Sequence, residues 1–167
     1  IAMTLGALVA AARTLAPDAR ARVDAAGCAD ARVTGVVHDS RAVAPGAVFV
    51  AIRGQRADGA AFAASAVARG ALAVISETPE PAPGGVLWLR TTDARLALAE
   101  LAALLYERPS ERLTVVGVTG TNGKTTTTYL LASVFDAAGL PCGRLGTVTF
   151  RTGPSPADER EASHTTP

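Results

Sequence analysis

One stretch of the sequence has the residue types and spacing of a phosphate-binding loop. It runs from Val115 to Thr128 and reads Val-Val-Gly-Val-Thr-Gly-Thr-Asn-Gly-Lys-Thr-Thr-Thr-Thr. The pattern predicts an apolar strand, a glycine-bearing turn and the start of a helix, whose free backbone N–H groups and dipole attract an anion. In such a loop Lys124 reaches the terminal phosphates of a nucleotide, and the Thr125 hydroxyl ligates a bridging magnesium ion.

The match to the general phosphate-loop pattern is partial. That pattern has a glycine five residues before Gly123, where this chain has Val118. An ordinary turn between a buried strand and an amphipathic helix would also account for Gly120 and Gly123. It would not account for the Lys124–Thr125 pair at the start of the helix, so we favour the phosphate loop.

The segment Thr-Gly-Thr-Asn-Gly-Lys-Thr-Thr resembles the ATP loop of the Mur ligases, which add amino acids to peptidoglycan precursors. The related folylpolyglutamate synthetases usually carry Gly-Lys-Gly-Ser at this point, so Thr125 and Thr126 favour the Mur side. Cyanophycin synthetases have a similar loop after a large ATP-binding region, for which we expect no room in this chain. The resemblance implies that Lys124 is catalytic, that Thr125 is a magnesium ligand and that ATP contacts the loop. The implied loop residues are Gly120, Thr121, Asn122, Gly123, Lys124, Thr125 and Thr126.

Further motifs precede the loop. They are His38-Asp39-Ser40-Arg41, Pro45 to Ala51, Gly54 to Gly59 and Gly70 to Val74. In this order they resemble the N-terminal domain of MurE and MurF ligases, which holds the uridine diphosphate end of the precursor. An isolated Asp39-Ser40-Arg41 would indicate only a capped surface turn. The order of all the motifs, ahead of a matching ATP loop, favours the ligase interpretation.

The resemblance implies a uridine site built from turns. Turn hydroxyls and free backbone groups suit the uracil edge and the ribose, while the diphosphate prefers cations or helix N-termini. Ser40 and the turn of Gln55, Arg56 and Ala57 are the candidates, and His38 would contribute mainly backbone or van der Waals contact. Family members commonly have histidine near the position of Gln55, and this chain departs from the family there.

Another pair of motifs follows the ATP loop. Gly146-Thr147 and His164-Thr165-Thr166-Pro167 resemble a Gly-Thr and Thr-Thr-Pro pair at this distance in MurE relatives. There the Thr-Thr segment meets the muramoyl-peptide portion of the substrate, which implies substrate contacts for Thr165 and Thr166. MurF relatives typically differ at this point. His164 fits a ligand and an exposed loop residue equally well, and we assign it no acid–base role.

Hydrophobic spacing predicts two α/β units around these motifs. Helices are expected over 5–15, 58–69, 92–106 and 124–139, and strands over 34–37, 48–52, 71–75, 86–89, 115–118 and 142–150. Gly70 is the expected C-cap of the second helix, and Thr92 or Asp93 the N-cap of the third. The segments 77–85 and 154–163 are expected to be loops.

The predicted fold class is α/β. A small N-terminal α/β uridine-nucleotide-binding domain is expected over residues 1–90, with a boundary near Arg90-Thr91. The beginning of a P-loop parallel-sheet domain, the central ATP-binding domain of Mur ligases, is expected over 91–167. Mur ligases have three domains, and their remaining metal ligands, carbamylated lysine, adenine pocket and amino-acid pocket would lie downstream. We therefore expect a fragment of a longer enzyme, without the C-terminal domain and inactive on its own.

Composition argues against several other classes of protein. The net charge of +1 and an aromatic content of 4% give neither a basic stripe nor a stacking platform, so nucleic-acid binding is not indicated. No apolar run approaches a membrane span, and the first residues lack the basic region of a signal peptide. Cys28 and Cys142 have no metal-ligand spacing and form no disulfide framework. These features predict a cytoplasmic protein.

The function implied by the resemblance is ATP-dependent amide ligation with Mg²⁺. The γ-phosphoryl of ATP would pass to a substrate carboxylate, and an amine would then attack the acyl phosphate. The leading hypothesis is a MurE-type ligase that joins a diamino acid, meso-diaminopimelate or L-lysine, to UDP-N-acetylmuramoyl-L-alanyl-D-glutamate. A MurF-type ligase is the alternative within the family, and a non-catalytic nucleotide-sugar-binding module is the alternative outside it.

Overall fold

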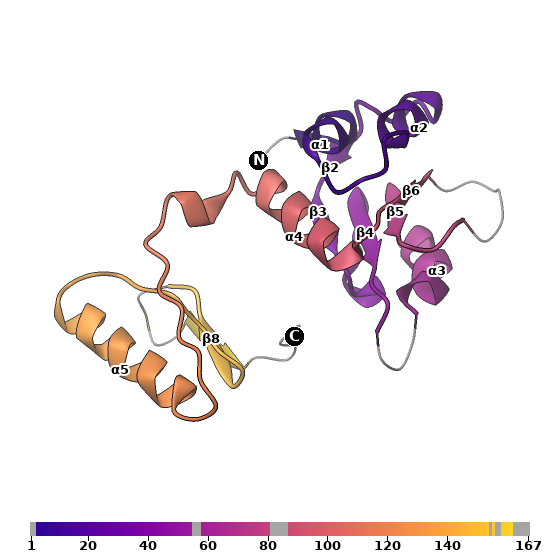
Figure 1. Cartoon of the computed structure of the whole chain (residues 1–167). Coiled ribbons are helices and arrows are strands. Elements are labelled where there is room, and N and C mark those ends of the chain that lie inside the picture. Colours follow the sequence, from indigo (N-terminus) through magenta and orange to yellow (C-terminus); the bar gives the residue numbers. More distant parts are fainter. Residues whose placement is uncertain (1–2, 55–57, 81–86, 154, 156–157, 162–167) are drawn as a thin grey trace. The chain divides into compact units, whose positions relative to one another are not determined.

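The chain forms two compact units, residues 1–113 and 114–167, in a computed structural model (Figure 1). The structure describes residues 3–54, 58–80, 87–153, 155 and 158–161. Within this described part, no helix combines the length and the apolar character that crossing a membrane requires.

The first unit is built on a four-stranded parallel sheet in the order β3-β4-β5-β6. Its strands are β3 (Gly35–Val37), β4 (Ala47–Ala51), β5 (Ala73–Ser76) and β6 (Leu87–Arg90). The register places Phe49 of β4 between Val37 and Val74, and Val74 in turn beside Trp88. A separate antiparallel pair is formed by β1 (Met3–Thr4) and β2 (Arg32–Val33).

Helices cover both faces of this sheet (Figure 1). They are α1 (Leu5–Ala11), α2 (Ala19–Ala25), α3 (Ala63–Ala68) and α4 (Ala94–Leu105). The 3-10 turns η1 (Ser40–Ala42), η2 (Gly59–Phe62) and η3 (Pro109–Glu111) follow β3, precede α3 and follow α4, respectively. Because successive strand residues point to opposite faces, Val48 and Val50 pack with α1, α2 and α4, whereas Phe49 packs with α3. The buried residues on both faces explain why the central strand β4 is apolar along its whole length.

The structure confirms the α/β class and corrects several boundaries in the first unit. The helix expected over 5–15 ends at Ala11, and α2 was not predicted. The helix expected over 58–69 is the turn η2 followed by α3, and Gly70 beyond it has a φ of +95°. The helix α4 buries Ala97, Leu101 and Leu105 against the sheet, so the first unit continues to residue 113, past the boundary expected near Arg90–Thr91.

Two carboxylates fix the start of α4. The Asp93 side chain accepts a hydrogen bond from the Leu96 N–H (2.9 Å), as expected of an N-cap. Glu77, from the loop after β5, accepts one from the Ala94 N–H (2.8 Å). Both negative charges also lie at the positive end of the helix dipole, which favours them.

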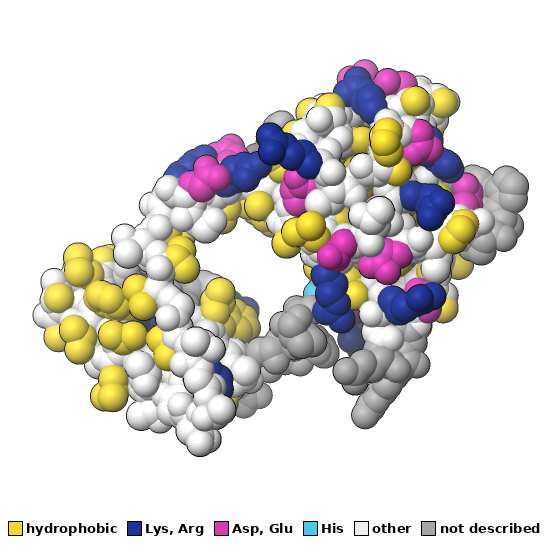
Figure 2. Space-filling view, in the orientation of Figure 1, with side chains coloured by type: hydrophobic (Ala, Val, Ile, Leu, Met, Phe, Trp, Pro, Cys, Tyr) yellow, Lys and Arg dark blue, Asp and Glu magenta, His cyan; other side chains and the backbone are white. Residues whose placement is uncertain are grey.

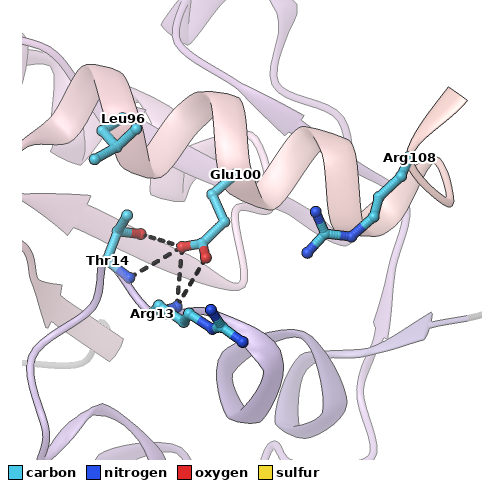
Figure 3. A pocket seen from close by; sticks show the side chains of 5 residues that line it. All are labelled: Arg13, Thr14, Leu96, Glu100 and Arg108. Carbon is cyan, nitrogen blue, oxygen red and sulfur yellow. Dashed lines mark hydrogen bonds between the residues drawn. The ribbon is translucent and has the colours of Figure 1, made fainter. Parts of the chain in front are cut away.

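Glu100 of α4 forms hydrogen bonds with the segment that follows α1. Its carboxylate accepts hydrogen bonds from the backbone N–H groups of Arg13 and Thr14 (3.0 Å each) and from the Thr14 hydroxyl (2.6 Å; Figure 3). Desolvation by burial pushes the pKa of Glu100 upward, but these hydrogen bonds outweigh it and hold the pKa below its ordinary value. The charged form of Glu100 therefore stabilises the folded unit.

The second unit contains one helix and a three-stranded antiparallel sheet. They are α5 (Lys124–Ala137), β7 (Arg144–Leu145), β8 (Thr149–Arg151) and β9 (Glu159–Glu161). The sheet order is β7-β8-β9, and both pairs are antiparallel.

This sheet contradicts the parallel arrangement that the sequence predicted. The short turn between β7 and β8 splits the strand expected over 142–150, and such a turn can join only antiparallel neighbours. Residues 114–119 form no strand, because a parallel strand depends on hydrogen-bonded neighbours and no described strand pairs with this segment. The loop expected over 154–163 contains β9, while residues 154, 156–157 and 162–163 lie outside the described part.

We expect Glu100→Gln to lower the stability of the first unit by about 1 kcal/mol near neutral pH, the typical net value of a hydrogen bond. The folded-state pKa is depressed, so the stabilisation is present above the unfolded pKa of about 4.3 and is lost as the pH falls through the folded-state value. Thermal unfolding near neutral pH and in acid should therefore show a melting-temperature deficit that shrinks in acid. Glu111→Gln, in an exposed ion pair with Arg108, is the control. A deficit of equal size at both pH values would contradict this account.

Candidate functional site

The turn before α5 has the backbone geometry of an anion cradle. Gly123 is the N-cap of α5 with a φ of +77°, and Gly120 has a φ of +148°, both in the region that favours glycine. The N–H of Thr127 donates to the Gly123 carbonyl (2.9 Å), which begins the helical hydrogen-bond ladder. The N–H groups of residues 124–126 therefore have no partner within the helix.

The side chains of this turn are open to a ligand. Residues 119–127 are exposed, and the Lys124 ammonium donates to the carbonyl oxygen of Gly120 across the turn. Lys124 is also the only lysine in the sequence. A phosphate could replace the neutral Gly120 carbonyl as its partner and form a stronger, charge-assisted hydrogen bond.

The donors around this turn fit the phosphates of a nucleotide. Unpaired N–H groups, an ammonium and the positive end of a helix of 14 residues converge on one exposed surface. The Thr125 hydroxyl is an oxygen ligand of the kind that Mg²⁺ accepts. No group of three His, Cys, Asp or Glu side chains among the described residues could hold a metal, so a magnesium ion here would need phosphate oxygens as further ligands.

The first unit presents a second candidate surface at the carboxyl edge of its parallel sheet. Open α/β sheets bind ligands at this edge, where the loops leave the strands. His38 follows β3 directly and is exposed, and Ser40 opens η1. Asp39 shapes this turn because its carboxylate accepts a hydrogen bond from the Arg41 N–H (2.9 Å). The structure thus places His38 and Ser40 together at this edge.

The remaining uridine candidates lie on the next loop along this edge. Gln55, Arg56 and Ala57 are outside the described residues, but the neck of their loop is well defined. Arg53 and Asp58 form an antiparallel bridge and an ion pair (3.6 Å), which closes the loop on itself.

Gly59 makes this closure possible. Its N–H donates to the Ile52 carbonyl (3.0 Å), and a Cβ added at Gly59 would lie 2.6 Å from that oxygen. Any side chain at this position would therefore displace the loop from the end of β4. This role of Gly59 was not predicted, although the place of Gly59 in the Gly54–Gly59 motif is a signal for it.

The candidates in the second unit are only partly described. Gly146 and Thr147 form the turn between β7 and β8. His164, Thr165 and Thr166 lie outside the described residues.

A further hollow in the first unit contains none of the predicted residues. It has a volume of about 660 Å³ and is lined by Arg13, Thr14, Leu96, Glu100 and Arg108 (Figure 3). Its lining comes from the segment after α1 and from α4 and its C-terminal end, which only the fold brings together. Sequence patterns could not indicate this hollow, because no local motif connects these residues.

Comparison with known proteins covers both units. Residues 32–106 match the Mur ligase family, catalytic domain, and residues 118–167 match the Mur ligase middle domain. The UDP-N-acetylmuramoyl-L-alanyl-D-glutamate–2,6-diaminopimelate ligase of Geobacter sulfurreducens is 47% identical over 135 residues, which make up 81% of this chain and 26% of the relative.

Solved structures agree with the sequence relatives. A UDP-N-acetylmuramoyl-L-alanyl-D-glutamate–2,6-diaminopimelate ligase matches with a TM-score of 0.58 at 31% identity, covering 74% of this chain and 25% of that one. The MurF ligase of Thermotoga maritima in complex with ADP matches with a TM-score of 0.50 at 35% identity, covering 61% and 23%. The chain spans about a quarter of the length of these relatives. With two successive domains of one family matched along its length, the chain belongs to the Mur ligase family.

Proposed function

We propose that this chain is the nucleotide-sugar-binding domain and the opening of the ATP-binding domain of a MurE-type ligase. The full protein would add a diamino acid to UDP-N-acetylmuramoyl-L-alanyl-D-glutamate. The observation that carries the proposal is the exposed turn at Gly120–Gly123, with Lys124 and unpaired N–H groups at the start of α5. This turn lies in the part of the chain that matches the Mur ligase middle domain.

The proposed reaction assigns a task to each group in the turn. ATP transfers its γ-phosphoryl to the substrate carboxylate, and the amine then displaces phosphate from the acyl phosphate to form the amide. Lys124 moves from the Gly120 carbonyl to the phosphate oxygens and stabilises the charge that develops during transfer. Thr125 would hold a Mg²⁺ ion, which would neutralise phosphate charge there, while Thr121, Asn122 and Thr126 line the same cradle.

Contacts with the muramoyl substrate are proposed for each unit separately. Ser40 and His38 at the carboxyl edge of the first sheet, together with the loop of Gln55–Ala57, would hold the uridine end, and that edge is where such sheets bind nucleotides. Thr165 and Thr166, next to His164, would meet the peptide end that carries the reacting carboxylate.

The choice of MurE over MurF rests on the relatives. The 2,6-diaminopimelate ligase of Geobacter sulfurreducens shares nearly half of its aligned residues with this chain. The diamino acid itself would bind outside the chain described here.

In the intact gene product, we expect Lys124→Ala to lower kcat by roughly 10²–10³-fold, the usual loss when one group that stabilises transition-state charge is removed. Lys124→Arg keeps the charge and should retain more activity than the alanine variant. Steady-state formation of the amide product with saturating ATP provides the measurement. Unchanged turnover in Lys124→Ala would refute the role given to this residue.

A chemical probe can test the cradle in the 167-residue chain itself. Pyridoxal 5′-phosphate carries a phosphate and an aldehyde that condenses with an amine, and borohydride reduction makes the adduct permanent. Because Lys124 is the only lysine, we expect one side-chain adduct by mass spectrometry, with ATP or pyrophosphate preventing it. Lys124→Arg is the matched control and should show labelling of the α-amino group alone. Labelling of Lys124 that pyrophosphate does not reduce would argue against a phosphate site.

Substrate preference separates the proposal from its alternatives. We expect the intact protein to bind UDP-N-acetylmuramoyl-L-alanyl-D-glutamate at least about tenfold more tightly than the corresponding tripeptide, a difference of about 1.4 kcal/mol. Isothermal titration calorimetry measures both affinities. Preference for the tripeptide would indicate a MurF-type ligase. Binding of the dipeptide without any ligation product would indicate a non-catalytic binding module.

A further inference from the structure

A polar network centred on a buried arginine joins α5 to the sheet inside the second unit. Arg144 of β7 is at its centre, with only 6% of its side chain exposed. The guanidinium lies 3.5 Å from the centroid of the Tyr129 ring, a cation–π contact. It also donates to the Thr149 hydroxyl (3.0 Å) and to the Glu159 carboxylate.

Glu159 of β9 receives three donors on one carboxylate oxygen. Besides Arg144, the Thr149 hydroxyl donates to it (2.6 Å) and so does the Tyr129 hydroxyl (3.1 Å). The hydrogen bonds from Thr149 and Tyr129, together with the Arg144 charge, hold the pKa of Glu159 below its ordinary value against desolvation. The network therefore links one helix and all three strands through a single ionised carboxylate.

Few apolar side chains of this unit are fully buried. Of the described residues in this unit, Ala132 is the only hydrophobic one that is buried, while Leu130 and Val134 of α5 are more than 60% exposed. Figure 2 shows hydrophobic side chains at the surface over α5. The ion pair of Arg151 with Asp136 (2.9 Å) is a second polar link between helix and sheet. This ion pair is a single link whose Asp136 side chain is 39% exposed, whereas the network joins α5 to every strand of the sheet. Among the polar contacts, the network therefore contributes most to the position of the sheet on α5.

The network lies between three segments with proposed roles. Tyr129 is little more than one helical turn from Lys124 on the same helix. Arg144 supports the turn at Gly146, where an added Cβ would lie 3.9 Å from the Arg144 Nη1 atom and 3.2 Å from the Thr149 carbonyl oxygen. Glu159 opens the strand after which the chain continues toward Thr165 and Thr166.

We propose that Tyr129, Arg144, Thr149 and Glu159 are positioning residues that hold the Gly146–Thr147 turn and β9 in register with the ATP loop. Resting on the proposed function, this assigns the network the task of aligning the substrate carboxylate with the γ-phosphoryl group. Its loss would misalign two reactants that are still bound, so kcat should fall while the binding of ATP is unchanged.

Each variant removes a chosen hydrogen bond or ion pair. Tyr129→Phe keeps the ring under Arg144 but removes the hydroxyl that α5 contributes to Thr149 and Glu159. Glu159→Gln removes the charge that pairs with buried Arg144 and is the stronger perturbation. Asp136→Asn is the matched control, because it weakens the other helix–sheet ion pair without touching the network.

The test measures kcat and the KM for ATP in the intact gene product. We expect Tyr129→Phe and Glu159→Gln to lower kcat about ten- to a hundredfold with the KM for ATP unchanged, and Asp136→Asn to leave both near wild type. Unchanged kcat in the first two variants, or an equal loss in Asp136→Asn, would overturn the proposal.

Hydrogen exchange separates this proposal from the proposed function. If the intact wild-type protein makes no amide product, the ligase assignment fails, but the network still predicts protection in the 167-residue chain. Tyr129→Phe should then speed amide exchange at 146–149 and 159–161, whereas Asp136→Asn should not. Equal exchange in Tyr129→Phe and wild type would refute the positioning role even if the protein is an active ligase.

Discussion

The first N–H groups of a helix have no partners within it, and the proposed nucleotide site depends on this constraint. In this chain the left-handed conformation of Gly123 lets the backbone enter α5 abruptly, so these groups face solvent rather than a preceding turn. The Lys124 ammonium lies across the same surface and contacts a backbone carbonyl. The polar contacts of Tyr129, at the middle of α5, link this helix to the sheet of the second unit.

The two units achieve cohesion by different physical means. The first buries aliphatic side chains on both faces of a parallel sheet, and polar contacts such as those of Glu100 only fasten its periphery. The second has a short antiparallel sheet and few buried apolar residues, so charged and hydroxyl groups take the place of a core. Charge-assisted hydrogen bonds depend on direction far more than apolar packing does, which suits a unit that must hold a reacting geometry.

The sequence predicted what local patterns determine. The apolar run at Val48 predicted β4, Asp93 indicated the start of α4, and the glycines before Lys124 predicted the turn into α5. The prediction failed where residues distant in the sequence determine the local structure. The first helix ends early because the Glu100 carboxylate, far along the chain, captures the N–H groups of Arg13 and Thr14.

The same limit applies to other elements and to the candidate site. The alanine-rich α2 was not predicted because its hydrophobic periodicity is weak. The segment at Val115 is apolar enough for a strand but has no described neighbour to pair with. The phosphate cradle was predictable because its residues are contiguous. The Arg144 network was not, because its four members come from four separate elements and none belongs to a motif.

The close approach of Gly59 to Ile52 has a consequence for how this surface can evolve. The loop between them leaves β4 and returns to it at the same point, where the bridge of Arg53 with Asp58 closes it. Changes of sequence between Arg53 and Asp58 would therefore leave the end of β4 in place, as long as this bridge and Gly59 are kept. If this edge binds a ligand as proposed, its preference could change while the sheet stays the same.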